Sequence, residues 1–183
     1  MVPRNKRHLN QEEKKREILN AASALFAENG FDGTSMTAIA RSAGITPNTI
    51  YWYFPGKDDV LIGVLNNLTT GVLAEMATMT ALPIRERLLN AITIFERPES
   101  LMNTVHSRIT QSEVIAAWHS RFHMLIEQIL VYEIIKAGIA KERAGTLARL
   151  LVYVIEGLLS HSLQQNDREN MVDALLELAN LPA

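Results

Sequence analysis

The stretch that decides the fold is residues 34–57, which read TSMTAIARSAGITPNTIYWYFPGK. Its first half has apolar residues at the i, i+3, i+4, i+7 spacing that places side chains on one helix face: Met36, Ile39, Ala40 and Ala43. Gly44 follows, and glycine favours the left-handed conformation that commonly ends a helix. The sequence therefore predicts a short helix, with Thr34 or Ser35 as its N-cap, that stops at Gly44.

A second short helix is predicted to start two residues later. Thr46 is a good N-cap, and Pro47 suits the first helical position, where a missing N–H costs nothing. Over seven to eight residues, a period of about 100° per residue groups Ile50, Tyr53 and Phe54 on one side and Asn48, Tyr51 and Trp52 on the other. The two helices form a helix-turn-helix, and the second is suited to the major groove of DNA.

The alternative is that both are ordinary packed helices whose Tyr and Trp side chains fill a core. Two features count against it: the regular order of cap, glycine, cap and proline, and a longer match. The chain resembles the tetracycline-repressor (TetR) family of bacterial regulators over roughly a quarter to a third of its length. The matching residues are Gly30-Phe31, Thr34-Ser35-Met36, Ile39-Ala40, Ala43-Gly44, Thr46, Tyr51, Tyr53-Phe54, Lys57 and Leu61.

The resemblance and the helix pattern together imply a set of DNA contacts. We expect Thr46 to cap the second helix and touch phosphate, Tyr51 and Lys57 to hold phosphates, and Pro47 and Thr37 to flank the contact. The side chains of Asn48, Thr49 and Trp52 would face the base edges or the sugars of the DNA. Family members often have glycine where this chain has Asn48, so the operator sequence cannot be transferred from relatives.

The rest of the chain reads as helices separated by clear breakers, which makes the fold class all-α. Helices are expected at about 11–29 and 57–79, two shorter ones from Pro83 and from Pro98, a long one from the Thr110–Glu113 capping box to Gly138, and two more at about 142–166 and 168–180. We divide the chain into a helix-turn-helix DNA-binding domain, residues 1–56, and a helical effector-binding and dimerisation domain, residues 57–183. In the family, helices like those of the second domain enclose an effector pocket and form the dimer.

The two predicted domains also differ in net charge. Residues 1–57 carry eight Lys or Arg against five Asp or Glu, whereas residues 58–183 carry ten against fifteen. A positive head and a negative body fit a protein whose head alone contacts double-stranded DNA. The basic arm, with Arg4, Lys6 and Arg7, either contacts phosphates or is a solvated terminus, and the sequence leaves both open.

Several classes of protein are excluded by composition. The chain has no cysteine, which rules out disulfides and thiolate metal sites. Residues 1–16 are polar and charged, unlike a secretory signal, so we expect a cytoplasmic location. The longest apolar stretch, 147–163, contains Arg149, Glu156 and His161, so it predicts a buried helix of a soluble protein and no membrane contact.

The last two helices carry more apolar surface than a body of this size can hide. We expect a homodimer in which these helices pair with those of a second subunit, as the family resemblance also implies. Gly157 would allow close helix approach. The candidate interface residues are Leu151, Val154, Gly157, Leu158, Leu175 and Leu176. The alternative is a monomer with a well-buried core.

An effector pocket is expected among aromatic, methionine and histidine side chains of the second domain. Pockets are mostly apolar with a few polar anchors. The candidate ligand-binding residues are Met76, Phe95, Met102, Trp118, His119, Phe122, His123 and Tyr153. For any one of them, plain core packing is the competing interpretation. No cofactor is expected.

The favoured function is a ligand-responsive repressor that a small apolar or amphipathic effector releases from a palindromic operator. An activator and an effector-independent regulator remain alternatives. A metal-dependent helical enzyme is a third, because His119 and His123 are four residues apart and so share a helix face, with Glu127 one further turn along. The chain lacks a His-Glu-x-x-His pattern there, so we expect neither catalysis nor a metal.

Overall fold

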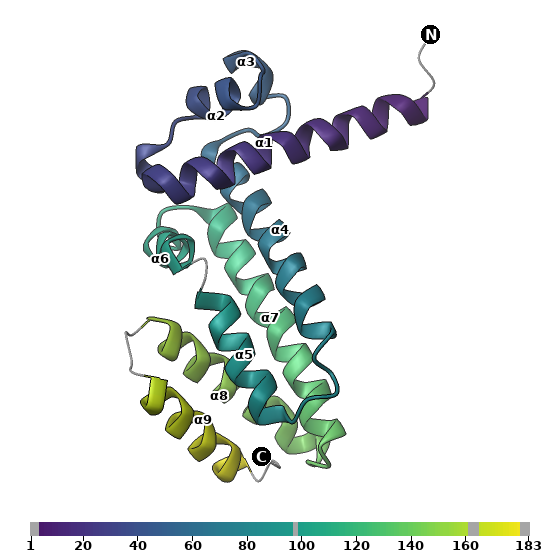
Figure 1. Cartoon of the computed structure of the whole chain (residues 1–183), viewed down its shortest axis with the longest axis vertical. Coiled ribbons are helices and arrows are strands. Elements are labelled where there is room, and N and C mark those ends of the chain that lie inside the picture. Colours follow the sequence, from purple (N-terminus) through teal and green to yellow (C-terminus); the bar gives the residue numbers. More distant parts are fainter. Residues whose placement is uncertain (1–3, 97–98, 161–164, 180–183) are drawn as a thin grey trace. The chain divides into compact units, whose positions relative to one another are not determined.

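The computed structural model describes the backbone of residues 4–96, 99–160 and 165–179, and the side chains of 10–94, 100–157 and 166–179. The described residues form helices and turns without a strand (Figure 1), as the all-α prediction requires. The helices are α1 (Arg4–Gly33), α2 (Met36–Ser42), α3 (Pro47–Ile50), α4 (Lys57–Ala77), α5 (Ile84–Glu96), α6 (Glu99–Arg108), α7 (Glu113–Lys136), α8 (Lys141–Ser160) and α9 (Gln165–Ala179).

The chain forms two compact units. The first comprises residues 1–69 and 100–115, and the second comprises residues 70–99 and 116–183. The predicted head, 1–56, lies wholly within the first unit, which also includes the start of α4 and most of α6. The boundary between the units falls inside α4 and inside α7, so these two helices belong in part to each.

The first unit has a core formed by one face of α1, the helix-turn-helix and the first turns of α4. Its fully buried side chains include Ile18, Phe26, Ile39, Ile50 and Leu61. Gly63 allows α4 to approach α1, because a Cβ atom there would lie 2.5 Å from a terminal carbon of Leu19. Among the described helices α4 alone is long and apolar enough to cross a membrane, a property that core helices share.

The second unit is built on α5, α8 and α9, with part of α7. Its core contains Leu88, Ile92, Ile134, Ala144, Ala148, Leu151, Val172, Leu176 and Ala179. This placement corrects two predicted dimer-interface residues. Leu151 is 3% exposed and Leu176 is 2% exposed within a single chain, so neither side chain is free to meet a second subunit.

Ion pairs connect the helices around this core. Arg85 on α5 donates two hydrogen bonds to Asp173 on α9, at 2.5 and 2.9 Å, and the pairing lowers the pKa of Asp173. Arg87 on α5 donates to Glu133 on α7 at 2.7 Å, and both side chains are largely shielded from water. Hydrogen bonding to the Arg87 guanidinium lowers the pKa of Glu133.

The Glu133 pair gives a stability prediction that depends on pH. Because the folded-state pKa of Glu133 is below its unfolded value, its contribution is present above the unfolded pKa and is lost as pH falls through the folded pKa. Glu133→Gln should therefore lower the free energy of unfolding by about 1–3 kcal/mol at pH 7. The deficit should shrink as the pH is taken below about 4.5.

Urea denaturation at a series of pH values measures this difference. Glu177→Gln, on an exposed position of α9, is the matched control and should change stability by less than about 0.5 kcal/mol. An equal deficit for Glu133→Gln at every pH would show that the charge of Glu133 contributes nothing.

Candidate nucleic-acid interface and ligand-binding region

The helix-turn-helix has the caps that its sequence predicts. Ser35 is the N-cap of α2, and its hydroxyl accepts a hydrogen bond from the backbone N–H of Ala38. Gly44 has a φ of 67°, the left-handed conformation expected at the turn. Thr46 is the N-cap of α3 and accepts from the N–H of Thr49 at 3.3 Å. The predicted turn between the two helices is therefore confirmed.

Two details differ from the prediction. Helix α3 spans four residues, Pro47–Ile50, and residues 51–53 form a turn in place of the expected seven-to-eight-residue helix. Thr34 is not a cap: its side chain is buried, and its hydroxyl donates to the carbonyls of Leu25 and Gly30. Thr34 therefore joins the end of α1 to the start of the helix-turn-helix.

The side chains predicted to meet DNA lie mostly on the surface of α3 and the turn after it. Trp52 is 87% exposed and Tyr51 is 53% exposed, whereas Ile50 is fully buried. Thr37, Thr46, Pro47 and Asn48 are exposed as well, and Thr49 is half-buried. A tryptophan left in water is unusual, because large aromatic side chains are highly buried on average. The arrangement leaves a polar and aromatic surface available to a partner.

Lys57 has a different environment from the one that a phosphate contact implies. Its ammonium group donates to the backbone carbonyls of Phe31 at 2.8 Å and Thr34 at 2.9 Å. It also lies 4.2 Å from the centre of the Phe31 ring, within cation–π range. These contacts attach the first residue of α4 to the segment that follows the kink of α1 at Gly30.

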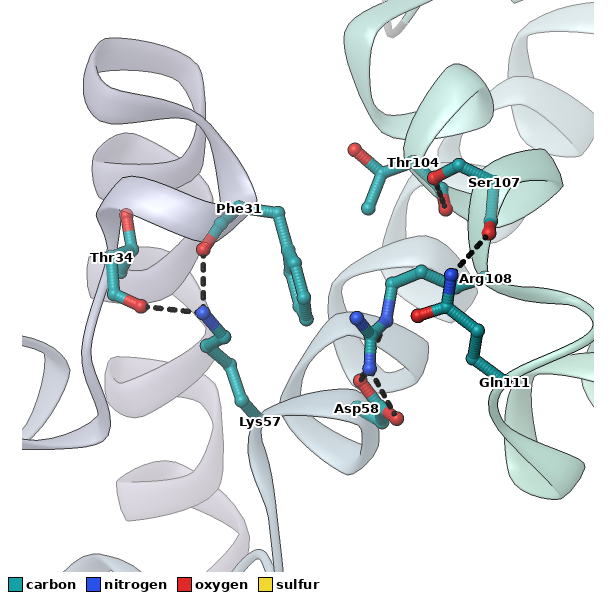
Figure 2. A network of polar contacts seen from close by, with 8 residues as sticks. All are labelled: Phe31, Thr34, Lys57, Asp58, Thr104, Ser107, Arg108 and Gln111. Atoms are coloured by element: carbon teal, nitrogen blue, oxygen red, sulfur yellow. Dashed lines mark hydrogen bonds and ion pairs between the residues drawn. The ribbon is translucent and has the colours of Figure 1, made fainter.

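The next residue of α4 holds a second contact, which the sequence did not reveal. Arg108 at the end of α6 donates to both carboxylate oxygens of Asp58 at 3.1 Å, and its guanidinium lies 4.8 Å from the Phe31 ring centre. Figure 2 shows the ring of Phe31 pointing toward Arg108, while the backbone carbonyl of Phe31 accepts a hydrogen bond from Lys57. Asp58 is also in the first turn of α4, where a negative charge is favourable.

The predicted ligand-binding residues are only partly brought together. Trp118 is buried and stacks on Phe122, with ring centres 5.1 Å apart. The rings of His119 and His123 are 4.1 Å apart, and that of Tyr153 is 6.4 Å from His123. These five residues belong to α7 and α8 in the second unit.

For the other three predicted ligand-binding residues, Met76, Phe95 and Met102, a role in ligand binding stays a prediction. Met102 belongs to the first unit, and Met76 is half-buried in the second. The side chain of Phe95 lies outside the described residues, as do those of Arg4, Lys6 and Arg7 in the basic arm.

A surface hollow of about 320 Å³ lies beside this cluster along α7. Its lining residues are Met124, Glu127, Gln128, Val131 and Arg149, none of which is among the eight predicted ligand-binding residues. Arg149 and Glu127 form an ion pair across it at 3.1 Å. The hollow is open to solvent, so the sequence pattern of buried apolar residues gave no indication of it.

The structure also shows which apolar side chains of the last two helices remain exposed. On α8 the exposed Leu150 and Tyr153 share one helix face with the half-buried Val154 and Gly157, at the i, i+3, i+4, i+7 spacing. On α9 the same spacing holds for Met171, Ala174, Leu175 and Leu178. Leu178 is 80% exposed, and Val154 and Leu175 are half-buried. The side chain of Leu158 lies outside the described residues.

The two hydrogen bonds that Lys57 donates to backbone carbonyls predict that this residue stabilises the fold. Lys57→Met should lower the free energy of unfolding by about 1–3 kcal/mol, because two carbonyl groups lose a charged donor. Thermal and urea denaturation followed by circular dichroism would record the change. Lys141→Met, at the exposed start of α8, is the control and should stay within about 0.5 kcal/mol. Equal stabilities for the two variants would contradict the role.

Comparison with known proteins places this geometry in a family. Residues 18–64 match the model of the bacterial regulatory proteins of the tetR family. The transcriptional repressor AcnR of Corynebacterium jeikeium is 24% identical over 180 residues, which cover 89% of this chain and 88% of that protein. Further curated regulators are 42–44% identical over 48 to 57 residues, which span about a quarter of their own length.

Solved structures agree over most of the chain. GusR of Salmonella enterica superposes with a TM-score of 0.72 at 22% identity, covering 92% of this chain and 94% of its own. A transcriptional regulator of Saccharomonospora viridis, solved in complex with choline, has a TM-score of 0.66 at 22% identity, covering 91% and 96%. Residues 18–64 are therefore a helix-turn-helix domain of the tetR family, and over most of its length the chain has the fold of helix-turn-helix transcriptional regulators.

Proposed function

We propose that this regulator is a cytoplasmic homodimeric repressor that leaves a palindromic DNA operator when a small molecule binds to its second unit. The observation that carries the proposal is the capped α3 helix and the turn after it, which bury Ile50 and present Asn48, Tyr51 and Trp52 to solvent. The relative AcnR is a named repressor, which favours repression over activation. No catalytic step is part of the proposal.

The DNA contacts follow from the exposed surface. Asn48, Thr49 and Trp52 face base edges or sugars, with Thr46 and Tyr51 on phosphates and Thr37 and Pro47 at the margin of the contact. Lys57 is assigned a positioning role in place of the expected phosphate contact, because two backbone carbonyls already accept from its ammonium group. An amide side chain at Asn48 is suited to adenine, which it can contact through two hydrogen bonds.

The dimer is assigned to the exposed stripes of α8 and α9. Each stripe has the spacing of a helix-packing face, and together they replace Leu151 and Leu176, which the chain's own core uses. Burying such stripes against a second copy would remove apolar surface from water, which is the main favourable term in association. A twofold dimer presents two α3 helices to half-sites roughly 34–36 Å apart.

The response to a small molecule is assigned to the aromatic and histidine cluster on α7 and α8. The choline complex of the S. viridis regulator supports a small-molecule role for this architecture. A ligand shifts the regulator off DNA only if it binds the two conformers with different affinity. The contact of Arg108 with Asp58 and Phe31 offers a route, because α6 and the head meet there within one unit.

The DNA assignment predicts separable effects of two substitutions. Asn48→Ala should weaken binding to the preferred site by about 1–3 kcal/mol and leave binding to unrelated duplex DNA unchanged, because a base contact carries specificity. Asn103→Ala, at an exposed position of α6, should alter neither. Fluorescence anisotropy titrations with both duplexes measure the ratio. An equal loss on both duplexes would contradict a base contact at Asn48.

The dimer assignment is tested by two glycines of α8. A Cβ atom at Gly157 or at Gly145 would meet nothing within 4 Å, so a side chain can leave the backbone at either position without a clash. Gly157 lies on the exposed stripe and Gly145 does not, so Gly157→Arg should split the dimer by burying an unpaired charge, whereas Gly145→Arg should remain dimeric. Sedimentation velocity at micromolar concentration, with circular dichroism to verify folding, decides. A dimeric and folded Gly157→Arg variant would refute the assigned surface.

A further inference from the structure

Two histidines and a carboxylate converge at one point of the second unit. His119 and His123 are separated by one turn of α7, and Glu156 comes from α8. The Nε2 atoms of both histidines lie 3.2 Å from the same oxygen, Oε1 of Glu156. All three side chains are partly buried, so the cluster is shielded from bulk water and still open to an ion.

The two His–Glu separations match edges of a metal coordination polyhedron. Zinc binds imidazole nitrogen at about 2.0–2.1 Å and carboxylate oxygen at about 2.0–2.2 Å, so neighbouring ligand atoms of a tetrahedral site are about 3.3–3.5 Å apart. The two observed distances of 3.2 Å, from each Nε2 atom to Oε1 of Glu156, are close to this edge length. The i, i+4 spacing presents both rings on the same side of α7, as paired histidine ligands require.

The donor set also selects the class of ion. Two imidazoles and one carboxylate suit Zn²⁺, Ni²⁺ and Co²⁺, whereas Mg²⁺ and Ca²⁺ prefer oxygen alone. The chain has no cysteine, so thiolate competition from elsewhere in the chain is absent. From this geometry we propose that His119, His123 and Glu156 form a binding site for a divalent transition-metal ion of the class of Zn²⁺, Ni²⁺ and Co²⁺.

Three protein ligands leave at least one coordination position open, as in metal sites that exchange a ligand. The surroundings of that position are aromatic: Phe122 lies with its ring centre 6.3 Å from that of His123, and Tyr153 at 6.4 Å. A small molecule with an oxygen or nitrogen donor and an apolar body fits this arrangement. The ion would thus supply the polar anchor of the effector site, a role that rests on the proposed function. Binding of the ion itself does not require that an effector release the protein from DNA.

The test measures metal binding by the full-length protein in the absence of DNA. Isothermal titration with Zn²⁺ after chelator treatment should give one ion per chain. Co²⁺ should produce the visible absorption bands of a site of low coordination number, and Mg²⁺ or Ca²⁺ should give no binding. The Co²⁺ spectrum requires no substitution, so it remains informative if a variant fails to fold. Absence of both Zn²⁺ binding and the Co²⁺ bands would overturn the proposal.

Substitutions then locate the ion. His119→Gln, His123→Gln and Glu156→Gln should each weaken Zn²⁺ binding at least tenfold, since outer partners of metal ligands alone contribute about 10–100-fold. His8→Gln is the control and should retain the wild-type affinity. Zinc should also raise the melting temperature of the wild type and not that of a folded Glu156→Gln variant. Undiminished affinity in all three folded variants would place the ion elsewhere and refute the site.

Discussion

The first unit depends on the position of Phe31 between two cations. Lys57 donates to the Phe31 carbonyl and lies over one part of its ring, while Arg108 approaches the same ring and is held by Asp58. Lys57 and Asp58 are consecutive residues of α4, so one helical turn connects the end of α1 with the end of α6. Removing any member would leave a charged group or a carbonyl without its partner, which costs more than the contact itself gains.

This arrangement explains why a helix-turn-helix of two short helices keeps a defined orientation. Helix α3 spans only Pro47–Ile50, too short to be stable alone, so its direction comes from its Thr46 cap and from the burial of Ile50. The exposed Trp52 and Tyr51 contribute little to this packing. Their exposure is understandable in a protein of this family, because the energy that holds the head comes from residues on its other side.

Local chemistry made much of this fold predictable from sequence. Gly44, Thr46 and Pro47 each specify a backbone conformation by themselves, so the turn could be located without knowledge of the rest. Helix α3 is shorter than predicted because the N–H groups of Trp52 and Tyr53 donate to the carbonyls of Thr49 and Ile50, three residues back, which are turn bonds that apolar periodicity does not distinguish from a helix. The surface hollow and the roles of Lys57 and Arg108 depend on backbone atoms and partners distant in sequence, which no spacing rule reveals.

Apolar periodicity has a further limit in α8 and α9. It identifies helices that bury more than one face, but it cannot say which face meets the same chain and which meets another. Leu151 and Leu176 lie in the chain's own core. The exposed stripes lie on another face of α8 and of α9, and only the structure distinguishes the two faces. The histidine pair was visible in the sequence as a spacing, whereas its third member, Glu156, became evident only when α8 was seen beside α7.

The central claim is that two copies of this chain read one DNA site with two α3 helices. Selection of duplexes from a random pool by the wild-type protein, followed by sequencing, tests it most directly. The account predicts an enriched inverted repeat whose half-site centres are roughly 34–36 Å apart, about one helical turn, or a multiple of it. Enrichment of no sequence, or of a single half-site without its repeat, would contradict it.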